Sequence, residues 1–173
     1  GDVAPGNFVV DRRTAEVSAL DCDSFEVRVD GVVHLGSAHT PAYSPPELLD
    51  APTTRPRRRN QVVFACALLA YQVLTVGLHA YSREWGDDPV ENLRSGRTVM
   101  GGSTGRATGW LHPALFSRYD GLHPAVKRAC IRTFVDGHRR PELRPSLEAW
   151  RDALRTQFQN LHRARDGKGA FLV

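Results

Sequence analysis

Residues 62–81 form an almost wholly apolar run, which constrains the fold more than any other feature of the sequence. The run is as long as a membrane-spanning helix. A helix that is apolar on all sides is also expected at the centre of a globular domain. Gln72, Thr75 and His79 interrupt the run and Gly77 is a suitable helix stop, and these residues favour a buried helix over a membrane span.

The run therefore predicts a central helix over residues 60–76, around which the rest of the chain packs. Its most strongly apolar positions should be buried, and we expect this of Phe64, Leu68, Leu69 and Val73.

Short strands precede this helix. Residues 8–10 and 16–20 flank a polar turn, and residues 25–29 and 32–35 flank the turn dipeptide Asp30-Gly31, so each pair predicts a β-hairpin. Prolines then follow one another closely through residues 36–58, where they disfavour long helices and allow only a helical turn at residues 46–49.

Shorter helices are expected after the central one. The pattern predicts helices over residues 88–94, 123–135 and 145–161, separated by a long irregular stretch over residues 95–122 that contains several glycines. In the last helix Trp150 and Leu154 should pack against the central helix. The sequence is thus mainly α with short β-hairpins, and residues 161–173 are interpreted as a basic tail or linker.

Charge is distributed unevenly along the 173 residues. Residues 1–50 hold nine acids and three arginines, so they carry a net charge of −6, while residues 51–173 carry +10. An acidic segment suits a divalent cation, and a basic one can attract phosphate or nucleic acid. The densest basic run, residues 55–59, has no interleaved aromatic residues and is interpreted as a solvated loop.

The cysteines give no sign of a disulfide framework or a zinc site. Cys22, Cys66 and Cys130 are odd in number and far apart, and none belongs to a CxxC or Cys/His pairing. Together with the absence of a charged-then-apolar leader, this leads us to expect a reduced, cytoplasmic protein.

Three ordered motifs carry the chemistry. They are Gly1-Asp2-Val3-Ala4-Pro5-Gly6-Asn7, then Asp21-Cys22-Asp23-Ser24-Phe25, then Thr40-Pro41-Ala42-Tyr43-Ser44-Pro45-Pro46-Glu47. Their order and spacing resemble the C-terminal lobe of the protein kinase fold. More narrowly, they resemble bacterial kinase-like proteins that often carry helix-hairpin-helix DNA-binding segments elsewhere in the chain. The resemblance covers about residues 1–158, so it implies a kinase-like C-lobe over residues 1–160.

The resemblance implies a role for each matched residue. Asp2 matches the catalytic base that accepts or orients the proton of the substrate hydroxyl. Asn7 and Asp21 match the two magnesium ligands that help to hold ATP, since metal ions neutralise charge on the transferring phosphoryl group. Thr40 and Tyr43 match the activation segment that shapes the acceptor-peptide site.

A second matched pair is architectural. Glu47 and Arg144 correspond to an ion pair that ties the end of the activation segment to the loop before the last helices. If the pair is buried, removing one partner leaves an uncompensated charge.

The sequence also departs from the kinase pattern. Ala4 replaces a lysine that lies near the transferring phosphate in many Ser/Thr kinases. Asn60 or Val62 replaces the usual aspartate at the start of the central helix, so the catalytic loop should be braced less firmly. Asp23 stands where a glycine is expected two residues after the metal-binding aspartate.

No glycine-rich phosphate loop and no Ala-x-Lys strand precede Asp2, so the N-terminal lobe is absent from this sequence. The resemblance implies a parent protein that transfers phosphate from ATP, with magnesium, to serine or threonine hydroxyls of a protein substrate. The alternative is a pseudokinase or binding scaffold, with nucleic acid contacted through other regions. In either case we expect the isolated chain to be inactive and prone to self-association.

Overall fold

The computed structural model describes residues 2–36, 39–50, 59–82, 87–100 and 113–168. These residues are mainly helical and include two small antiparallel hairpins. The α-helices are α1 (Arg59–Leu74), α2 (Pro89–Ser95), α3 (Pro113–Asp120), α4 (Pro124–Cys130) and α5 (Leu147–Lys168), and the strands are β1 (Phe8–Val10), β2 (Val17–Ala19), β3 (Val27–Val29) and β4 (Val32–His34). One-turn 3-10 helices occur at Pro5–Asn7, Cys22–Ser24, Pro41–Tyr43, Pro46–Leu48 and Pro141–Leu143.

Both hairpins form where the sequence predicts them. β1 pairs with β2 in the register Phe8↔Ala19, and β3 pairs with β4 in the register Val27↔His34. The β3–β4 turn has positive φ at both Asp30 (48°) and Gly31 (80°), which is the type I′ geometry that matches strand twist.

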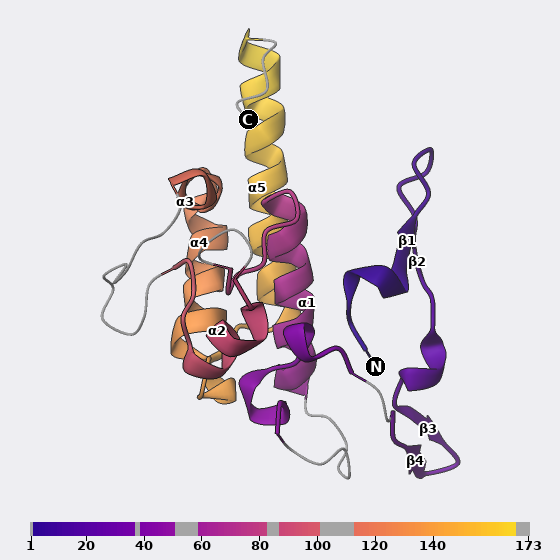
Figure 1. Cartoon of the computed structure of the whole chain (residues 1–173). Helices are drawn as coiled ribbons and strands as arrows, with labels where there is room; N and C mark the ends of the chain where they lie inside the picture. The colour runs from indigo at the N-terminus through magenta and orange to yellow at the C-terminus, as the bar shows by residue number, and fades with distance from the viewer. Residues whose placement is uncertain (1, 37–38, 51–58, 83–86, 101–112, 169–173) are drawn as a thin grey trace.

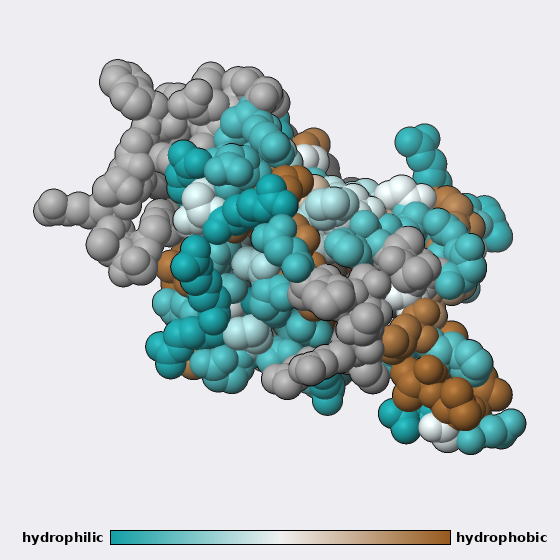
Figure 2. Space-filling model, turned by 60° about the horizontal axis from the view of Figure 1, so that its bottom comes forward, coloured by the Kyte–Doolittle hydropathy of each residue, from teal (hydrophilic) through white to brown (hydrophobic). Residues whose placement is uncertain are grey.

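The hairpins lie beside the helical body rather than inside it (Figure 1). Their apolar side chains are largely exposed, as at Val17 (63%) and Val32 (57%). Apolar side chains also gather on the protruding part at the lower right of Figure 2, on the side where Figure 1 places the hairpins.

Helix α1 is the centre of the core, as the apolar run predicts. Phe64 and Leu68 are fully buried, so the prediction for these two residues is confirmed. Leu69 is half-buried. The prediction for Val73 is wrong, because its side chain is 74% exposed. Val73 lies in the last turn of α1, on a face that the described residues leave open to solvent.

Aromatic rings fill the space around α1. Phe134 lies edge-on to Phe64, with ring centroids 5.5 Å apart, and close to Tyr71 and Trp150. Trp150 is 3% exposed, which confirms that it packs from α5 against the core, and Leu154 is partly buried against the same cluster. Such edge-to-face pairs contribute beyond the area that they bury.

Three features of the helical part differ from the sequence prediction. The stretch predicted to be irregular contains α3, which begins at Pro113, a residue that favours the first helical turn. The helix expected over residues 123–135 becomes a π-helix from Ile131 to Asp136. Helix α5 continues past Leu161 to Lys168, into the segment assigned to the tail.

No helix among the described residues is long and apolar enough to span a bilayer. Of the basic run at 55–59, only Arg59 lies within the described residues. It begins α1 and forms an ion pair with Glu148 at the start of α5.

Candidate functional site

Asp2 is held by a residue close to it in the sequence, Asn7, and by a distant one, Thr40. The Thr40 backbone N–H donates to Oδ1 of Asp2 (2.8 Å), and the Thr40 hydroxyl donates to Oδ2 (2.7 Å). The Asn7 amide Nδ2 donates to the Asp2 carbonyl (2.9 Å) and, at 3.4 Å, to Oδ2. The Asp2 carboxylate is therefore fixed in orientation, because both of its oxygens accept hydrogen bonds.

Local structure explains how Asn7 reaches Asp2. Pro5 starts a single 3-10 turn over Pro5–Asn7, which brings the Asn7 side chain back over the preceding residues. The Leu20 N–H then donates to the Asn7 carbonyl (2.7 Å), so the end of β2 is attached to the same turn.

This attachment brings Asp21 close to Asp2. Asp21 follows β2 and adopts the left-handed conformation (φ 51°, ψ 52°), which aspartate tolerates better than most residues. A hydrogen bond with Asp23, the negative charge of Asp23 and the charge of Asp2 raise the pKa of the exposed Asp21 carboxyl. Three acidic side chains thus share one region of negative potential.

These side chains fit a magnesium ion only in part. Asp21 supplies a carboxylate, and Asn7, which donates from Nδ2, presents its Oδ1 as an acceptor. Within the described ranges, no three His, Cys, Asp or Glu side chains converge closely enough to hold a metal ion by themselves. Magnesium commonly binds one or two carboxylates and completes its coordination shell with water and phosphate oxygens. These side chains are therefore compatible with a magnesium ion whose coordination shell is completed by a nucleotide.

The segment after Thr40 is fixed to the end of the central helix. The Tyr43 hydroxyl donates to Oε1 of Gln72 (2.8 Å), and the Tyr43 ring lies edge-on to His79 at 5.6 Å. His79 accepts from the Tyr81 N–H at Nδ1 (3.2 Å), so Nε2 carries the proton that it donates to the Ala42 carbonyl (2.8 Å). Burial lowers the pKa of His79, which favours the neutral form of the ring.

Sequence reasoning missed Gln72 and His79 as parts of the site. Both are polar residues that interrupt the apolar run, and this interruption was the feature of the sequence that could have identified them. A polar residue in a buried helix needs a partner, and the partners here come from the proline-containing segment.

Glu47 and Arg144 form a bidentate ion pair with two N–O distances of 2.8 Å. The Arg144 side chain is fully buried and that of Glu47 is 26% exposed. Arg144 also donates to the carbonyls of Gly137 (2.9 Å), Asn60 (3.1 Å) and His138 (3.2 Å). Its guanidinium lies 4.8 Å from the centroid of Phe64. The pair therefore joins the end of the 40–47 segment to the loop before α5.

The structure also shows the surroundings of two residues that depart from the kinase pattern, Ala4 and Asn60. Ala4 is buried and offers no charge beside Asp2. Oδ1 of Asn60 is buried and accepts no hydrogen bond from any residue that the structure describes, while its backbone carbonyl accepts from Arg144. Asn60 therefore contacts the buried arginine through its backbone.

The structure thus brings Asp2, Asn7 and Thr40 together, and the charge of Asp2 acts on the Asp21 carboxyl. The Glu47–Arg144 ion pair does not belong to this group, and its arginine is fully buried.

Over about half its length the chain is similar to a bacterial protein kinase. The relative is named Protein kinase YegI in Escherichia coli K12, and it is 37% identical over 84 residues, which is 47% of this chain; a second, from E. coli O157:H7, aligns to the same extent. The aligned residues cover 13% of these relatives' length. The chain matches no family model and no solved structure. The comparison therefore supports a kinase-like relationship.

Proposed function

We propose that the chain is the C-terminal lobe of a kinase-like protein that transfers phosphate from ATP to serine or threonine hydroxyls of a protein substrate. The observation that carries the proposal is the double hydrogen bond from Thr40 to the Asp2 carboxylate. It joins two motifs that lie 38 residues apart and that the kinase resemblance assigns to one site. The partial similarity to Protein kinase YegI supports the same class of activity.

In this proposal Asp2 orients the acceptor hydroxyl. Both of its oxygens accept hydrogen bonds from Thr40, and Oδ2 also accepts one from Asn7. These donors fix the orientation of the carboxylate, which would accept the proton of a substrate hydroxyl and direct the oxygen toward the phosphoryl group. Thr40 is then a positioning residue, because it acts through Asp2.

Asn7 and Asp21 would hold magnesium together with ATP. The ion would neutralise charge on the phosphates. The negative charges of Asp23 and Asp2 act on Asp21, and a bound cation would relieve the repulsion among these carboxylates, which supports the assignment.

A second candidate is a pseudokinase or binding scaffold that transfers no phosphate and acts at DNA. Two observations favour it. Ala4 provides no cation for the transferring phosphate, and the Asn60 side chain offers no charge to brace the catalytic loop.

Phosphate transfer by the full-length protein distinguishes the two candidates. With radiolabelled ATP and magnesium, we expect autophosphorylation or phosphorylation of a generic protein substrate. Asp2→Ala should abolish it, while Asp11→Ala, which removes an exposed acid from the β1–β2 turn, should leave it unchanged. Normal nucleotide binding without any phosphate transfer would favour the pseudokinase.

Thr40→Val tests the positioning role. The substitution removes the hydroxyl that donates to Asp2 and keeps the backbone N–H. We expect kcat to fall about tenfold or more with little change in the KM for ATP, because the loss affects orientation of the acceptor. Equal losses in Thr40→Ser and Thr40→Val would contradict this role, since serine keeps the hydroxyl.

A further inference from the structure

Exposed arginines gather on the outer side of α4 and the π-helix that follows it. Residues 123–140 hold five lysines and arginines and one acid, Asp136. Arg128 and Arg132 lie one turn apart on the exposed side, while Ala129 and Thr133 of the opposite side are buried. Strongly hydrophilic side chains cover much of the left part of the helical body in Figure 2, on the side where Figure 1 places α2 and α4.

A close contact between α2 and the loop after the π-helix extends this basic surface. Gly96 ends α2 in the left-handed conformation (φ 73°), and a Cβ there would lie 3.2 Å from the His138 ring. Arg97 and Arg139 are the next residues of the two segments, and both are exposed. The contact therefore brings together two segments that each carry an exposed positive charge. We call the set of Arg97, Arg128, Arg132 and Arg139 the arginine band.

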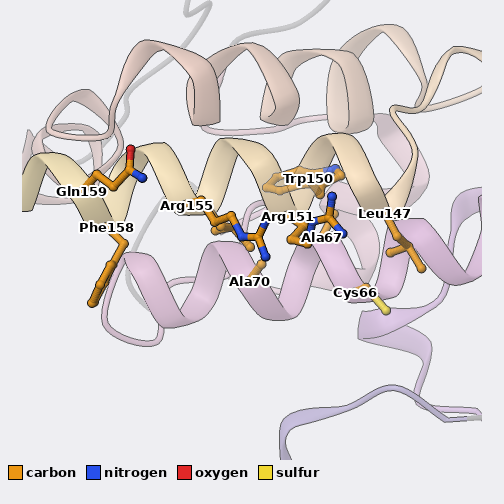
Figure 3. Close-up of a pocket in the computed structure, with 10 residues that line it drawn as sticks. Cys66, Ala67, Ala70, Leu147, Trp150, Arg151, Arg155, Phe158 and Gln159 are labelled. Carbon is orange, nitrogen blue, oxygen red and sulfur yellow. The ribbon is translucent and has the colours of Figure 1, made fainter.

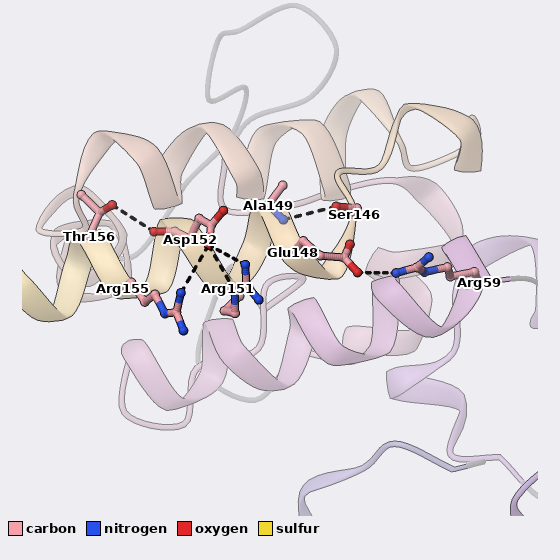
Figure 4. A network of polar contacts seen from close by, with 8 residues as sticks. All are labelled: Arg59, Ser146, Glu148, Ala149, Arg151, Asp152, Arg155 and Thr156. Atoms are coloured by element: carbon pink, nitrogen blue, oxygen red, sulfur yellow. Dashed lines mark hydrogen bonds and ion pairs between the residues drawn. The ribbon is translucent and has the colours of Figure 1, made fainter.

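Other arginines of the helical body have acidic partners. Figure 4 shows Arg59 paired with Glu148, and Arg151 and Arg155 both in contact with Asp152. Arg151 and Arg155 also line the groove between α1 and α5 that Figure 3 shows. The positive charge on this side of the molecule is therefore partly neutralised by the chain itself.

The charge of the arginine band is left largely uncompensated. Arg97 has a long contact of 3.9 Å with Glu91, and no acid that the structure describes forms an ion pair with the other three members. The positive potential reaches the interior, since the charges of Arg139 and Arg144 add to burial in lowering the pKa of His138. An anion bound at the band would offset this repulsion among like charges.

The chemistry of the arginine band favours a phosphate backbone as its ligand. A guanidinium binds phosphate through two parallel N–H donors. The four arginines come from the end of α2, a loop, the π-helix and α4, and this spread suits a ligand with repeated charges better than a single anion. π-Helical turns are also frequent at functional sites.

The neighbouring side chains distinguish among polyanions. Among residues 87–100 and 117–144, one large apolar side chain is exposed, that of Ile131 (38%), and no phenylalanine, tyrosine or tryptophan ring is. Single-stranded nucleic acid usually stacks its bases on such rings, and membrane surfaces take up several apolar side chains at once. A duplex needs neither, because its two strands present a dense row of phosphates.

We propose that the arginine band binds the phosphate backbone of duplex DNA without reading its sequence. Each of the four arginines neutralises one phosphate, so the affinity decreases steeply as the salt concentration rises. The proposal does not rest on phosphate transfer, and its failure would leave that proposed function standing.

Fluorescence anisotropy of a labelled duplex of mixed sequence tests the proposal on the 173-residue chain. Titrations over a range of potassium chloride concentrations should give a plot of log Kd against log salt with a slope of about 3 to 4. The triple variant Arg128→Gln, Arg132→Gln, Arg139→Gln should raise Kd about tenfold or more and reduce this slope by about 3.

The control is the triple variant Arg59→Gln, Arg151→Gln, Arg155→Gln, which removes the same net charge from arginines that have acidic partners. It should leave the slope nearly unchanged, and circular dichroism verifies that both variants fold. A chain that does not bind the duplex at low salt, or equal losses in the two triple variants, would overturn the proposal.

Competition experiments identify the class of ligand. Unlabelled duplex should displace the labelled duplex, while polyglutamate and phosphatidylserine vesicles at matched charge should displace it poorly. Equal displacement by polyglutamate would show that the band accepts acidic protein surfaces, and equal displacement by vesicles that it accepts membranes. Tighter binding of oligothymidylate would assign the band to single strands. Each of these three results would overturn the assignment to duplex DNA.

Discussion

Arg144 joins three parts of the chain through one buried guanidinium. It contacts Glu47 at the end of the 40–47 segment, the Asn60 carbonyl at the start of α1, and the Gly137 and His138 carbonyls after the π-helix. Gly137 is required at this contact, because a Cβ there would lie 2.6 Å from Cγ of Arg144. A buried charge with this many partners is costly to leave uncompensated.

Glu47→Ala should therefore destabilise the fold strongly. The substitution leaves the fully buried Arg144 side chain without its carboxylate, and we expect the free energy of unfolding to fall by about 3–5 kcal/mol. Urea denaturation measures the change. The control is Glu142→Ala, which breaks the exposed Arg140–Glu142 pair (3.4 Å) and should cost less than about 1 kcal/mol. Similar losses in both variants would mean that Arg144 finds other compensation.

His138 should make the stability depend on pH. Burial, followed by the charges of Arg139 and Arg144, lowers the pKa of His138 to about 4 from an ordinary value of 6.5. Between these two values the unfolded chain binds more protons than the folded chain, so the free energy of unfolding decreases as the pH falls. The full contribution is present above pH 6.5, and about 3 kcal/mol of it is lost by pH 4.

The pH effect is measured by urea denaturation of wild type and His138→Gln between pH 7 and pH 4. Carboxyl groups titrate in both proteins, so the difference between the two profiles isolates His138. His34→Gln, at an exposed position in β4, should reproduce the wild-type profile. A His138→Gln profile parallel to that of wild type would exclude this source of pH dependence.

Among the elements, α1 contains both buried and exposed apolar residues, although these residues look alike in the sequence. Leu68→Ala should cost about 2–5 kcal/mol, because Leu68 is fully buried in the aromatic core. Val73→Ala should cost less than about 1 kcal/mol, since its side chain is 74% exposed. Chemical denaturation of the two variants measures both values. A large loss in Val73→Ala would indicate that this face of α1 is covered in solution.

Local patterns sufficed for most elements. The alternation of apolar residues and the Asp30-Gly31 turn predicted the hairpins, and the apolar run predicted α1. The run could not distinguish Leu68 from Val73, because a helix that is apolar on all sides has no periodicity to show which face is buried. The π-helix from Ile131 to Asp136 was not predictable, because the apolar spacing of residues 123–135 fits an ordinary α-helix.

At the scale of the site, the sequence indicated which residue types belong together but not how they are held. Asp2, Asn7 and Thr40 were proposed from ordered motifs, and the hydrogen bonds between them required the fold. Gln72 and His79 carried no motif. Their role depends on the segment that packs against α1, which local sequence does not reveal.

For the whole molecule, the hairpins and the helical body should differ in stability. The strands are three residues long and largely exposed on both faces, and isolated hairpins of this kind are marginally stable. The helices share one core, in which α4 and α5 pack closely and Phe64, Tyr71 and Phe134 have no exposed surface. Local opening should therefore cost little in the hairpins and nearly the full unfolding free energy in α1.

Amide hydrogen exchange measures this difference directly. We expect the paired amides of β1–β4 to exchange with weak protection and those in the middle of α1 to exchange only through global unfolding. The Thr40 amide is informative, because it donates to Asp2 and so connects the hairpin part to the helical body. Asp2→Ala should speed exchange at Thr40 while leaving α1 unchanged. If α1 loses protection together with Thr40, the hairpin part and the helical body open as one cooperative unit, and the contact between Asp2 and Thr40 contributes to global stability as well as to the site.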